Sequence, residues 1–164
     1  MKLRFWILQA ILAAMGLILA RAVFAQVPNI EGTYKLVSRT LPDGRVQRPP
    51  EAMGLATFTK THRNFNIMWK DASGKHFSLS SVSTYKLTGT EYSETLLFRV
   101  ISDQIGGKEI VYDLSGKTQS SPVKIEGGRV QFKFPFEAPV VIFDQDKMTA
   151  ATVGGPVAVW ERVQ

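Results

Sequence analysis

The sequence predicts an all-β domain folded as an antiparallel up-and-down β-barrel of about eight strands. Between residues 30 and 163, short runs alternate between apolar and polar residues, and turns rich in Gly, Pro, Asp and Ser separate these runs. No segment in this range has the sustained periodicity of a helix. An open sheet edge invites aggregation, and closure into a barrel removes both edges. A barrel of roughly eight strands is wide enough for packed side chains or for one small ligand.

The first 25 residues carry the features of a signal peptide, predicted to form a helix and to be cleaved after Ala25. Lys2 and Arg4 give a basic start, a long apolar stretch follows, and small residues precede the predicted cleavage point. A retained anchor is the alternative, because the apolar stretch approaches the roughly 20 residues that span a bilayer. Arg21 interrupts that stretch and favours cleavage. The prediction is a periplasmic or secreted protein without a membrane span after signal cleavage.

Residues 26–164 have a length typical of one domain with one core. The chain contains no cysteine, which excludes disulfides and thiolate metal sites. Export without disulfides favours a bacterial periplasm or exterior. Removal of Lys2, Arg4 and Arg21 with the leader lowers the formal net charge from +6 to +3. The remaining basic residues are scattered, and this distribution argues against a nucleic-acid partner.

The first predicted strand covers residues 31–40, where alternate positions are apolar and polar. Pro42, Asp43 and Gly44 then supply the residues that a tight turn needs. Residues 45–51 are predicted to be a loop, because their two prolines cannot donate to a strand ladder. The other predicted strands cover residues 54–61, 64–70, 75–87, 91–101, 110–112, 122–125, 130–136, 139–143, 147–153 and 156–163.

Residues 102–119 are the least regular part of the domain. Gly106 and Gly107 precede residues 110–112, which fit either a short strand or one turn of helix, and the strand is preferred. Residues 115–121 are polar and are predicted to be a loop.

Glu94 interrupts the otherwise apolar face of the strand predicted over residues 91–101. Tyr92, Leu96 and Phe98 are expected on that same face. A carboxylate there needs either contact with water at the mouth of the barrel or a buried partner. The mouth is the preferred position.

Both ends of the domain carry short motifs with a resemblance to a known family. Gly32-Thr33-Tyr34 opens the first strand and Trp160-Glu161-Arg162 stands in the last one. The chain thus resembles the lipocalin superfamily, and more closely bacterial lipocalin-like domain proteins, with tyrosine where the family has tryptophan. The resemblance implies that Arg162 packs over Tyr34 and joins first and last strands, because a guanidinium can stack on an aromatic ring while its donors bind carbonyl groups.

The resemblance implies a protein that binds or sequesters a small hydrophobic or amphipathic molecule inside the barrel, without catalysis and without a cofactor. The first alternative is a barrel filled by its own side chains that acts through protein interaction, as an inhibitor or envelope accessory factor. Inward serine hydroxyls favour a cavity, because they need partners. The residues predicted to bind the ligand are Tyr34, Arg63, Phe65, Trp69, Ser81, Tyr85, Phe98, Phe132 and Phe134.

Polar and titratable residues give no further signature of chemistry. In the segment 62–66, Arg63 could hold a ligand carboxylate, with asparagines adding amide contacts; a polar hairpin turn is the preferred interpretation. His62 and His76 are expected at opposite ends of a hairpin, which predicts no metal or haem site. No Gly-x-Ser-x-Gly turn or phosphate-binding glycine loop is present. The protein is predicted not to be an enzyme, with a barrel isomerase or hydrolase as second alternative.

Overall fold

The computed structural model describes residues 27–163, which form thirteen antiparallel strands in one sheet. These residues contain no helix, so the all-β prediction is confirmed for them. The predicted signal peptide, its helix and its cleavage point at Ala25 lie outside the described residues. No helix among residues 27–163 is long and apolar enough to span a bilayer.

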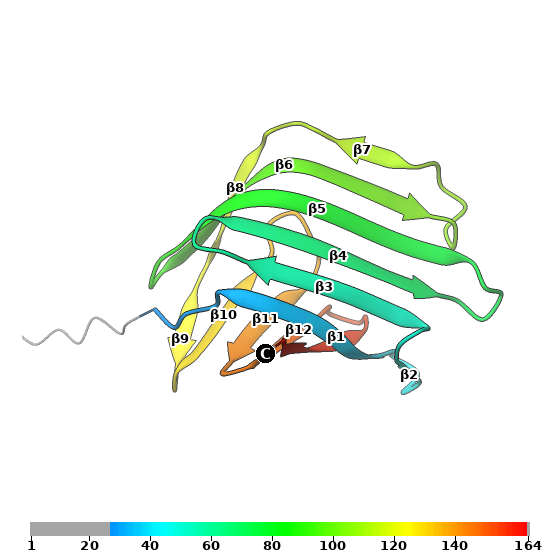
Figure 1. Ribbon diagram of the computed structural model, residues 1–164, viewed down its shortest axis with the longest axis horizontal. Helices are drawn as coiled ribbons and strands as arrows, with labels where there is room; N and C mark the ends of the chain where they lie inside the picture. Colours follow the sequence, from blue (N-terminus) through cyan, green and yellow to red (C-terminus); the bar gives the residue numbers. More distant parts are fainter. Residues whose placement is uncertain (1–26, 164) are drawn as a thin grey trace, which may run out of the picture.

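The strands follow the order β7-β6-β5-β4-β3-β1-β13-β12-β11-β10-β9 across the sheet, with β2 beside β1 and β8 beside β6. Figure 1 shows the long strands β3 to β6 running side by side, with β10 to β12 on the other side of β1. Neighbours in sequence are mostly neighbours in space, as expected for a meander. The strand bounds are β1 Gly32–Thr40, β2 Val46–Gln47, β3 Ala52–Phe58, β4 His62–Lys70, β5 His76–Leu87, β6 Glu91–Asp103, β7 Val111–Asp113, β8 Thr118–Pro122, β9 Lys124–Glu126, β10 Arg129–Lys133, β11 Val140–Asp144, β12 Lys147–Ala151 and β13 Val157–Arg162.

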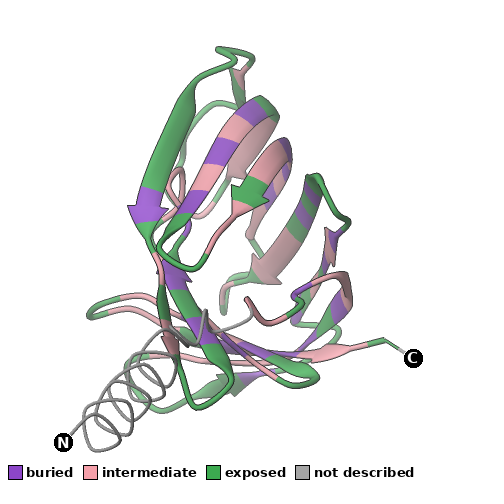
Figure 2. Cartoon of the chain, turned by 90° about the vertical axis from the view of Figure 1, so that its left-hand side faces the viewer, coloured by how far each residue is buried: buried purple, intermediate pink, exposed green. Residues whose placement is uncertain are grey.

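Alternation along each strand decides which side chains face the interior. In β4, Arg63 and Phe65 are buried while His62, Asn64 and Asn66 are exposed. Figure 2 shows the same alternation as bands of buried and exposed residues along the strands. Because successive strand residues point to opposite faces, the two-residue period of the sequence already defines the interior face of the long strands.

The sheet is not closed into a barrel, which corrects the predicted closed barrel of about eight strands. β7 and β8 are two short strands that pair with different parts of β6. The open seam lies between β8 and β10, where the Ser121 hydroxyl donates to the Lys133 carbonyl over 2.6 Å. Pro122 ends β8 and has no N–H to donate, and no ladder joins these two strands.

The segment predicted as a polar loop over residues 115–121 contains most of β8, so this part of the prediction was wrong. Thr118–Pro122 lacks apolar alternation, and only Ser121 in it is buried. Pairing with β6 makes it a strand, and the Thr95 and Thr118 hydroxyls lie 2.8 Å apart across that pair. Tertiary pairing here overrides a weak local preference.

The first and last strands meet as the sequence predicts, in the middle of the strand order. β1 pairs with β13, and Tyr34 lies opposite Arg162. The Arg162 guanidinium donates to the Tyr34 hydroxyl over 2.8 Å and to the Glu31 carbonyl over 2.7 Å. It also lies 5.2 Å from the centre of the Tyr34 ring. The contact therefore joins the two halves of the coiled sheet, while the seam lies elsewhere.

A β-bulge in β6 changes which side chains face inward. Ser83 pairs with Leu96 but Val82 pairs with Phe98, so Leu97 has no partner in β5. The extra residue reverses the alternation beyond it. Phe98 consequently faces outward with 37% of its surface exposed, and Arg99 faces inward instead. The prediction that Phe98 shares the inner face with Tyr92 was wrong, because sequence alternation does not reveal the bulge.

Candidate functional site

One end of the interior is filled by aromatic rings, which we call the aromatic cluster. Tyr92 and Phe132 are stacked with ring centres 4.2 Å apart, and Phe58 meets Phe143 edge-on at 5.3 Å. Such offset and edge-on contacts are the favoured geometries of aromatic pairs. The members of the cluster are Tyr34, Phe58, Tyr85, Tyr92, Phe132, Phe134 and Phe143.

The opposite end of the interior is hollow and contains a cavity of about 410 Å³. Its walls come from β1, β4, β5, β6, β12 and β13 and from residues 134–139, the segment between β10 and β11. The lining is mainly apolar. It comprises Arg39, Phe65, Ile67, Trp69, Phe77, Leu79, Arg99, Ile101, Phe134, Phe136, Glu137, Ala138, Pro139, Ala150, Thr152, Pro156, Ala158 and Trp160.

Small residues on β12 and β13 leave this space open. Ala150 lies directly opposite Ala158 on the inner face, and both line the cavity. Trp160 fills the next inner position of β13 and packs on the backbone of Gly54, where an added Cβ would lie 2.5 Å from the indole. Two alanines beside large rings create a hollow that closely packed cores normally lack.

Two arginines lie in the cavity wall. The Arg39 guanidinium stacks 4.0 Å from the centre of the Trp69 ring, and its Nη1 donates to Gln47 over 2.6 Å. Arg99 donates to the Phe136 carbonyl over 2.7 Å and is paired with Asp113 at 3.2 Å. Both guanidinium groups are therefore held in fixed positions beside an apolar space.

Three charged side chains, here called the buried ion cluster, lie between the cavity and the aromatic cluster. Arg63 donates to both carboxylate oxygens of Glu137, over 2.8 and 2.7 Å, and lies 2.9 Å from Glu94. Arg63 also donates to Ser81 over 3.3 Å and stacks 4.3 Å from the centre of the Phe134 ring. The Arg63 and Glu94 side chains are 0% exposed. Glu137 thereby fixes the segment 134–139 over the interior.

Burial dominates the electrostatics of this cluster. It raises the pKa of Glu94; the charge of Arg63 acts against this shift and that of Glu137 adds to it. Burial alone would lower the pKa of Arg63, but the carboxylates of Glu137 and Glu94 outweigh burial and raise it. The preferred prediction that Glu94 lies at the mouth was wrong, because a buried cation on β4 supplies the partner that it needs.

The structure separates the nine residues predicted to bind a ligand into four places. Phe65, Trp69 and Phe134 line the cavity. Tyr34, Tyr85 and Phe132 belong to the aromatic cluster. Arg63 is part of the buried ion cluster, and Ser81 accepts a hydrogen bond from it. Arg63 binds a carboxylate of the protein itself and lies in strand β4, not in the polar hairpin turn that was the preferred interpretation of residues 62–66. Phe98 lies on the outer surface.

Sequence reasoning missed the three charged residues of the cavity wall: Arg39, Arg99 and Glu137. Arg39 is in a strand that was predicted correctly, and its inward position follows a second irregularity, a register shift between Leu36 and Ser38. Arg99 turns inward because of the bulge at Leu97. A charged residue in a strand that is otherwise buried is the signal that could have found the two arginines.

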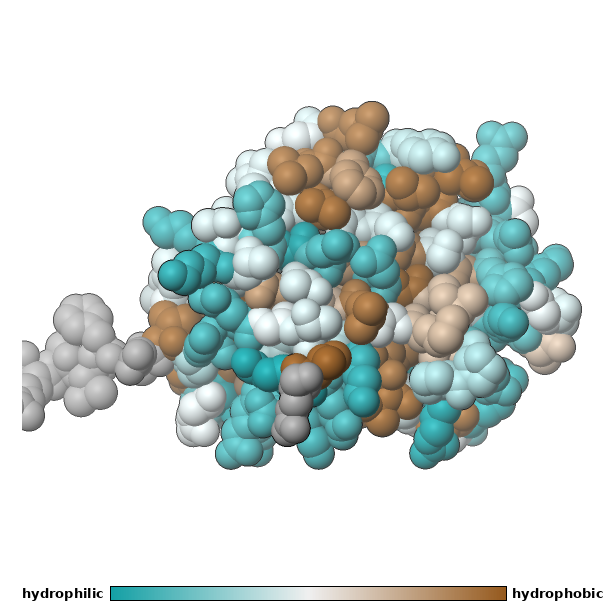
Figure 3. Space-filling model, viewed as in Figure 1, coloured by the Kyte–Doolittle hydropathy of each residue, from teal (hydrophilic) through white to brown (hydrophobic). Residues whose placement is uncertain are grey.

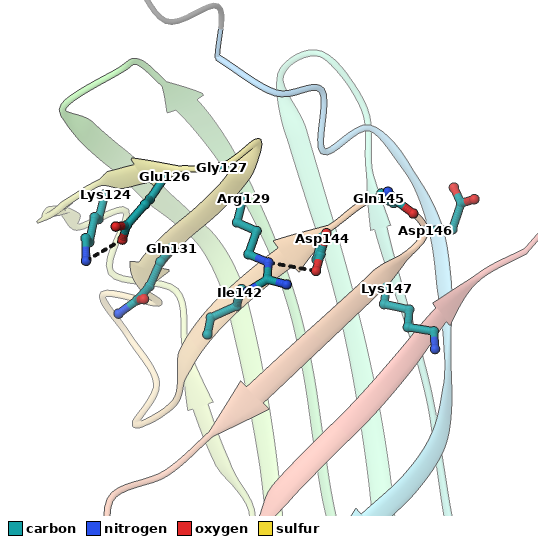
Figure 4. Close-up of a pocket in the computed structure, with 10 residues that line it drawn as sticks. All are labelled: Lys124, Glu126, Gly127, Arg129, Gln131, Ile142, Asp144, Gln145, Asp146 and Lys147. Carbon is teal, nitrogen blue, oxygen red and sulfur yellow. Dashed lines mark hydrogen bonds and ion pairs between the residues drawn. The ribbon is translucent and has the colours of Figure 1, made fainter.

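A second, polar groove lies on the outer surface over β9 to β12 (Figure 4). Its charged side chains are largely paired with each other: Lys124 with Glu126 at 2.7 Å and Arg129 with Asp144 at 2.8 Å. Exposed pairs of this kind contribute little energy and offer few free groups for a ligand. The interior cavity is therefore the stronger candidate site.

The two histidines lie far apart along the β4–β5 pair, as the sequence predicts. His62 pairs with Thr84 at one end, and His76 pairs with Lys70 at the other. Within residues 27–163, no group of three His, Asp or Glu side chains is arranged to hold a metal ion.

Comparison with solved structures finds two chains with a limited likeness to this one. One is an uncharacterized protein from Bacteroides eggerthii DSM 20697, with 18% identity and a TM-score of 0.39 over 82% of this chain and 100% of that chain. The other is a lipocalin-like protein from Bacteroides uniformis ATCC 8492, with 13% identity and a TM-score of 0.32 over 82% and 98%. No family model matches the chain, and no curated protein matches it. A likeness at these identities and TM-scores assigns neither a family nor a ligand to this chain.

Proposed function

We propose that this protein binds a small hydrophobic or amphipathic molecule in the cavity at the hollow end of the sheet. The observation that carries the proposal is the cavity itself, about 410 Å³ of space with aromatic and aliphatic walls and a few fixed polar groups. Ligand sites in proteins have this size and this composition. The protein performs no catalysis in this proposal and acts as a carrier or a sequestering protein.

The proposal is tested with N-phenyl-1-naphthylamine, a neutral apolar probe whose fluorescence rises in an apolar site. The probe should bind saturably to the folded protein, and a fatty acid should displace it. Ala150→Leu places a larger side chain in the cavity and should weaken probe binding at least tenfold. Ala151→Leu, the neighbouring position on the opposite face of β12, is the matched control and should bind as the wild type does.

Two results would contradict this function. One is the absence of saturable binding to the wild type. The other is equal probe binding by the wild type and the Ala150→Leu variant. Far-UV circular dichroism of both variants establishes that the fold is retained, so that a loss of binding reports on the cavity.

We also propose that the protein is exported to the periplasm or secreted, with cleavage after Ala25. The basic start and apolar stretch of the leader support this proposal. Fractionation of producing cells together with the intact mass of the protein tests it. A mass that includes residues 1–25 would contradict cleavage and favour the retained anchor.

Protein interaction is the second candidate function, and one surface favours it. Ile110, Val111, Tyr112 and Leu114 lie on or beside the edge strand β7 and are 53–74% exposed. Figure 3 shows apolar side chains gathered over this part of the molecule, above β6 and β7. Exposed apolar patches at a strand edge are typical of pairing surfaces. If the protein acts through this surface and its cavity binds no ligand, Val111→Lys should abolish binding of the partner protein, and the wild type should show no saturable binding of the probe.

A further inference from the structure

Three arginines lie in or below the cavity, and carboxylates neutralise two of them. Arg63 is bound by Glu137 and Glu94. Arg99 is paired with Asp113 at 3.2 Å. Arg39 has no carboxylate within 4.0 Å among residues 27–163, so its charge is the one in the cavity wall that the protein leaves without a direct counter-ion.

The Arg39 side chain is fixed in place although its charge is not neutralised. Its guanidinium lies against the face of Trp69, and its Nη1 donates to the buried side chain of Gln47. Gln47 is held in turn by the Lys70 carbonyl over 2.7 Å. Nε and Nη2 of Arg39 have no acceptor in the described protein and are not sealed from solvent. Two donors on a preorganised guanidinium are thus available to a ligand.

Burial without a counter-ion is unfavourable for Arg39. Its pKa is lowered by burial, and no neighbouring charge counteracts this effect. An anion next to the guanidinium would relieve the penalty, and a carboxylate fits its parallel donors.

The charges along the cavity define a polarity. Arg39 and Trp69 lie at the end of the interior where β1 and β4 finish. Arg63 precedes Trp69 by six residues on the same face of β4, so about 20 Å separates these two positions at 3.3 Å per residue. The buried ion cluster contains two carboxylates for one guanidinium, so it repels an anion, whereas Arg39 attracts one. A headgroup is favoured beside Arg39, and an apolar tail is favoured against Phe65 and Trp160 deeper in the cavity.

We propose that the ligand is an acidic amphiphile whose carboxylate binds Arg39 at the cavity wall. This inference rests on the proposed function and adds the charge of the ligand, its orientation and the residue that selects it. One unneutralised positive charge matches one monoanionic headgroup. An alcohol with the same tail fills the same apolar space but leaves the guanidinium without its counter-ion.

Displacement of N-phenyl-1-naphthylamine by decanoate and by decanol tests this inference. Both molecules should displace the probe from the wild type. Arg39→Gln should weaken displacement by decanoate at least tenfold, a factor that corresponds to about 1.4 kcal/mol, and should change displacement by decanol less than twofold. Arg129→Gln, an exposed arginine paired with Asp144 on the outer surface, is the matched control and should leave both unchanged.

Arg39→Lys keeps the charge but not the paired donors, and it should weaken decanoate binding by an intermediate factor. This variant carries the test if Arg39→Gln does not fold. Equal losses for decanoate and decanol would overturn the inference, because Arg39 would then be only part of the wall; the proposed function would stand. If neither molecule displaces the probe, or the probe does not bind, the proposed function fails as well.

Discussion

Replacement of Arg63 by methionine removes the cation at the centre of the buried ion cluster. Methionine has similar length and is apolar, so the substitution leaves Glu94 and Glu137 without the group that binds them. Loss of one partner of a buried ion pair costs about 3–5 kcal/mol. Arg63 makes two short hydrogen bonds to Glu137 and an ion pair with Glu94. We therefore expect the free energy of unfolding to fall by about 4 kcal/mol at pH 7, a large part of the roughly 5–15 kcal/mol of a typical domain.

The cost of this substitution should depend on pH, because the remaining Glu94 carboxylate can take up a proton. The pKa of Glu94 is raised in the folded protein by burial, and loss of Arg63 raises it further. A carboxyl with a raised pKa binds its proton more tightly in the folded state than in the unfolded state. Its destabilising effect is therefore complete above the folded pKa and is relieved as the pH falls toward the unfolded value. The loss in the Arg63→Met variant should be smaller at pH 5 than at pH 7.

Urea unfolding followed by tryptophan fluorescence and circular dichroism at both pH values measures this effect. Glu94→Gln is the control. It resembles the protonated carboxyl, and Glu137 still binds Arg63 through two hydrogen bonds, so its unfolding free energy should stay within about 1 kcal/mol of the wild type. A loss below about 1 kcal/mol for Arg63→Met at pH 7, or a loss that grows on acidification, would refute the reasoning.

Three further substitutions or conditions test other parts of the structure. Gly54→Ala places a Cβ 2.5 Å from the Trp160 ring and should cost about 1–3 kcal/mol, with a shifted tryptophan emission spectrum; an unchanged spectrum and stability would contradict this close contact. Arg162→Met removes the hydrogen bonds to the Tyr34 hydroxyl and to a backbone carbonyl and should lower the unfolding free energy by about 2 kcal/mol. An unchanged unfolding free energy in urea would show that this contact does not stabilise the fold. The pKa of Tyr85 is raised to about 12, chiefly by burial, so the folded state holds this proton more tightly and stability should fall as the pH rises from 10 toward 12; this part of the fall should be absent in Tyr85→Phe.

The sequence determined those features that depend on a local period of two. It placed Phe65 and Trp69 on one face of β4 and Ser81 and Tyr85 on one face of β5. The cavity lining confirms the first pair, and the interior contacts of Ser81 with Arg63 and of Tyr85 with Tyr92 confirm the second. The resemblance of the chain's two end motifs to a known family also predicted that Arg162 of the last strand meets Tyr34 of the first. The shared faces follow from the opposite directions of successive side chains in a strand, and this alternation requires no knowledge of the whole fold.

The tertiary structure alone decided where the interior is filled and where it is hollow. Ala150 and Ala158 create a cavity only because the sheet curls so that they face rings from β4 and β5. Glu137 becomes the partner of Arg63, 74 residues earlier, only when the segment 134–139 folds over that interior. The bulge that turns Arg99 inward leaves no periodic signal. Such features depend on the volumes and charges of side chains that are distant in the chain, whereas a local pattern reports only on its own strand.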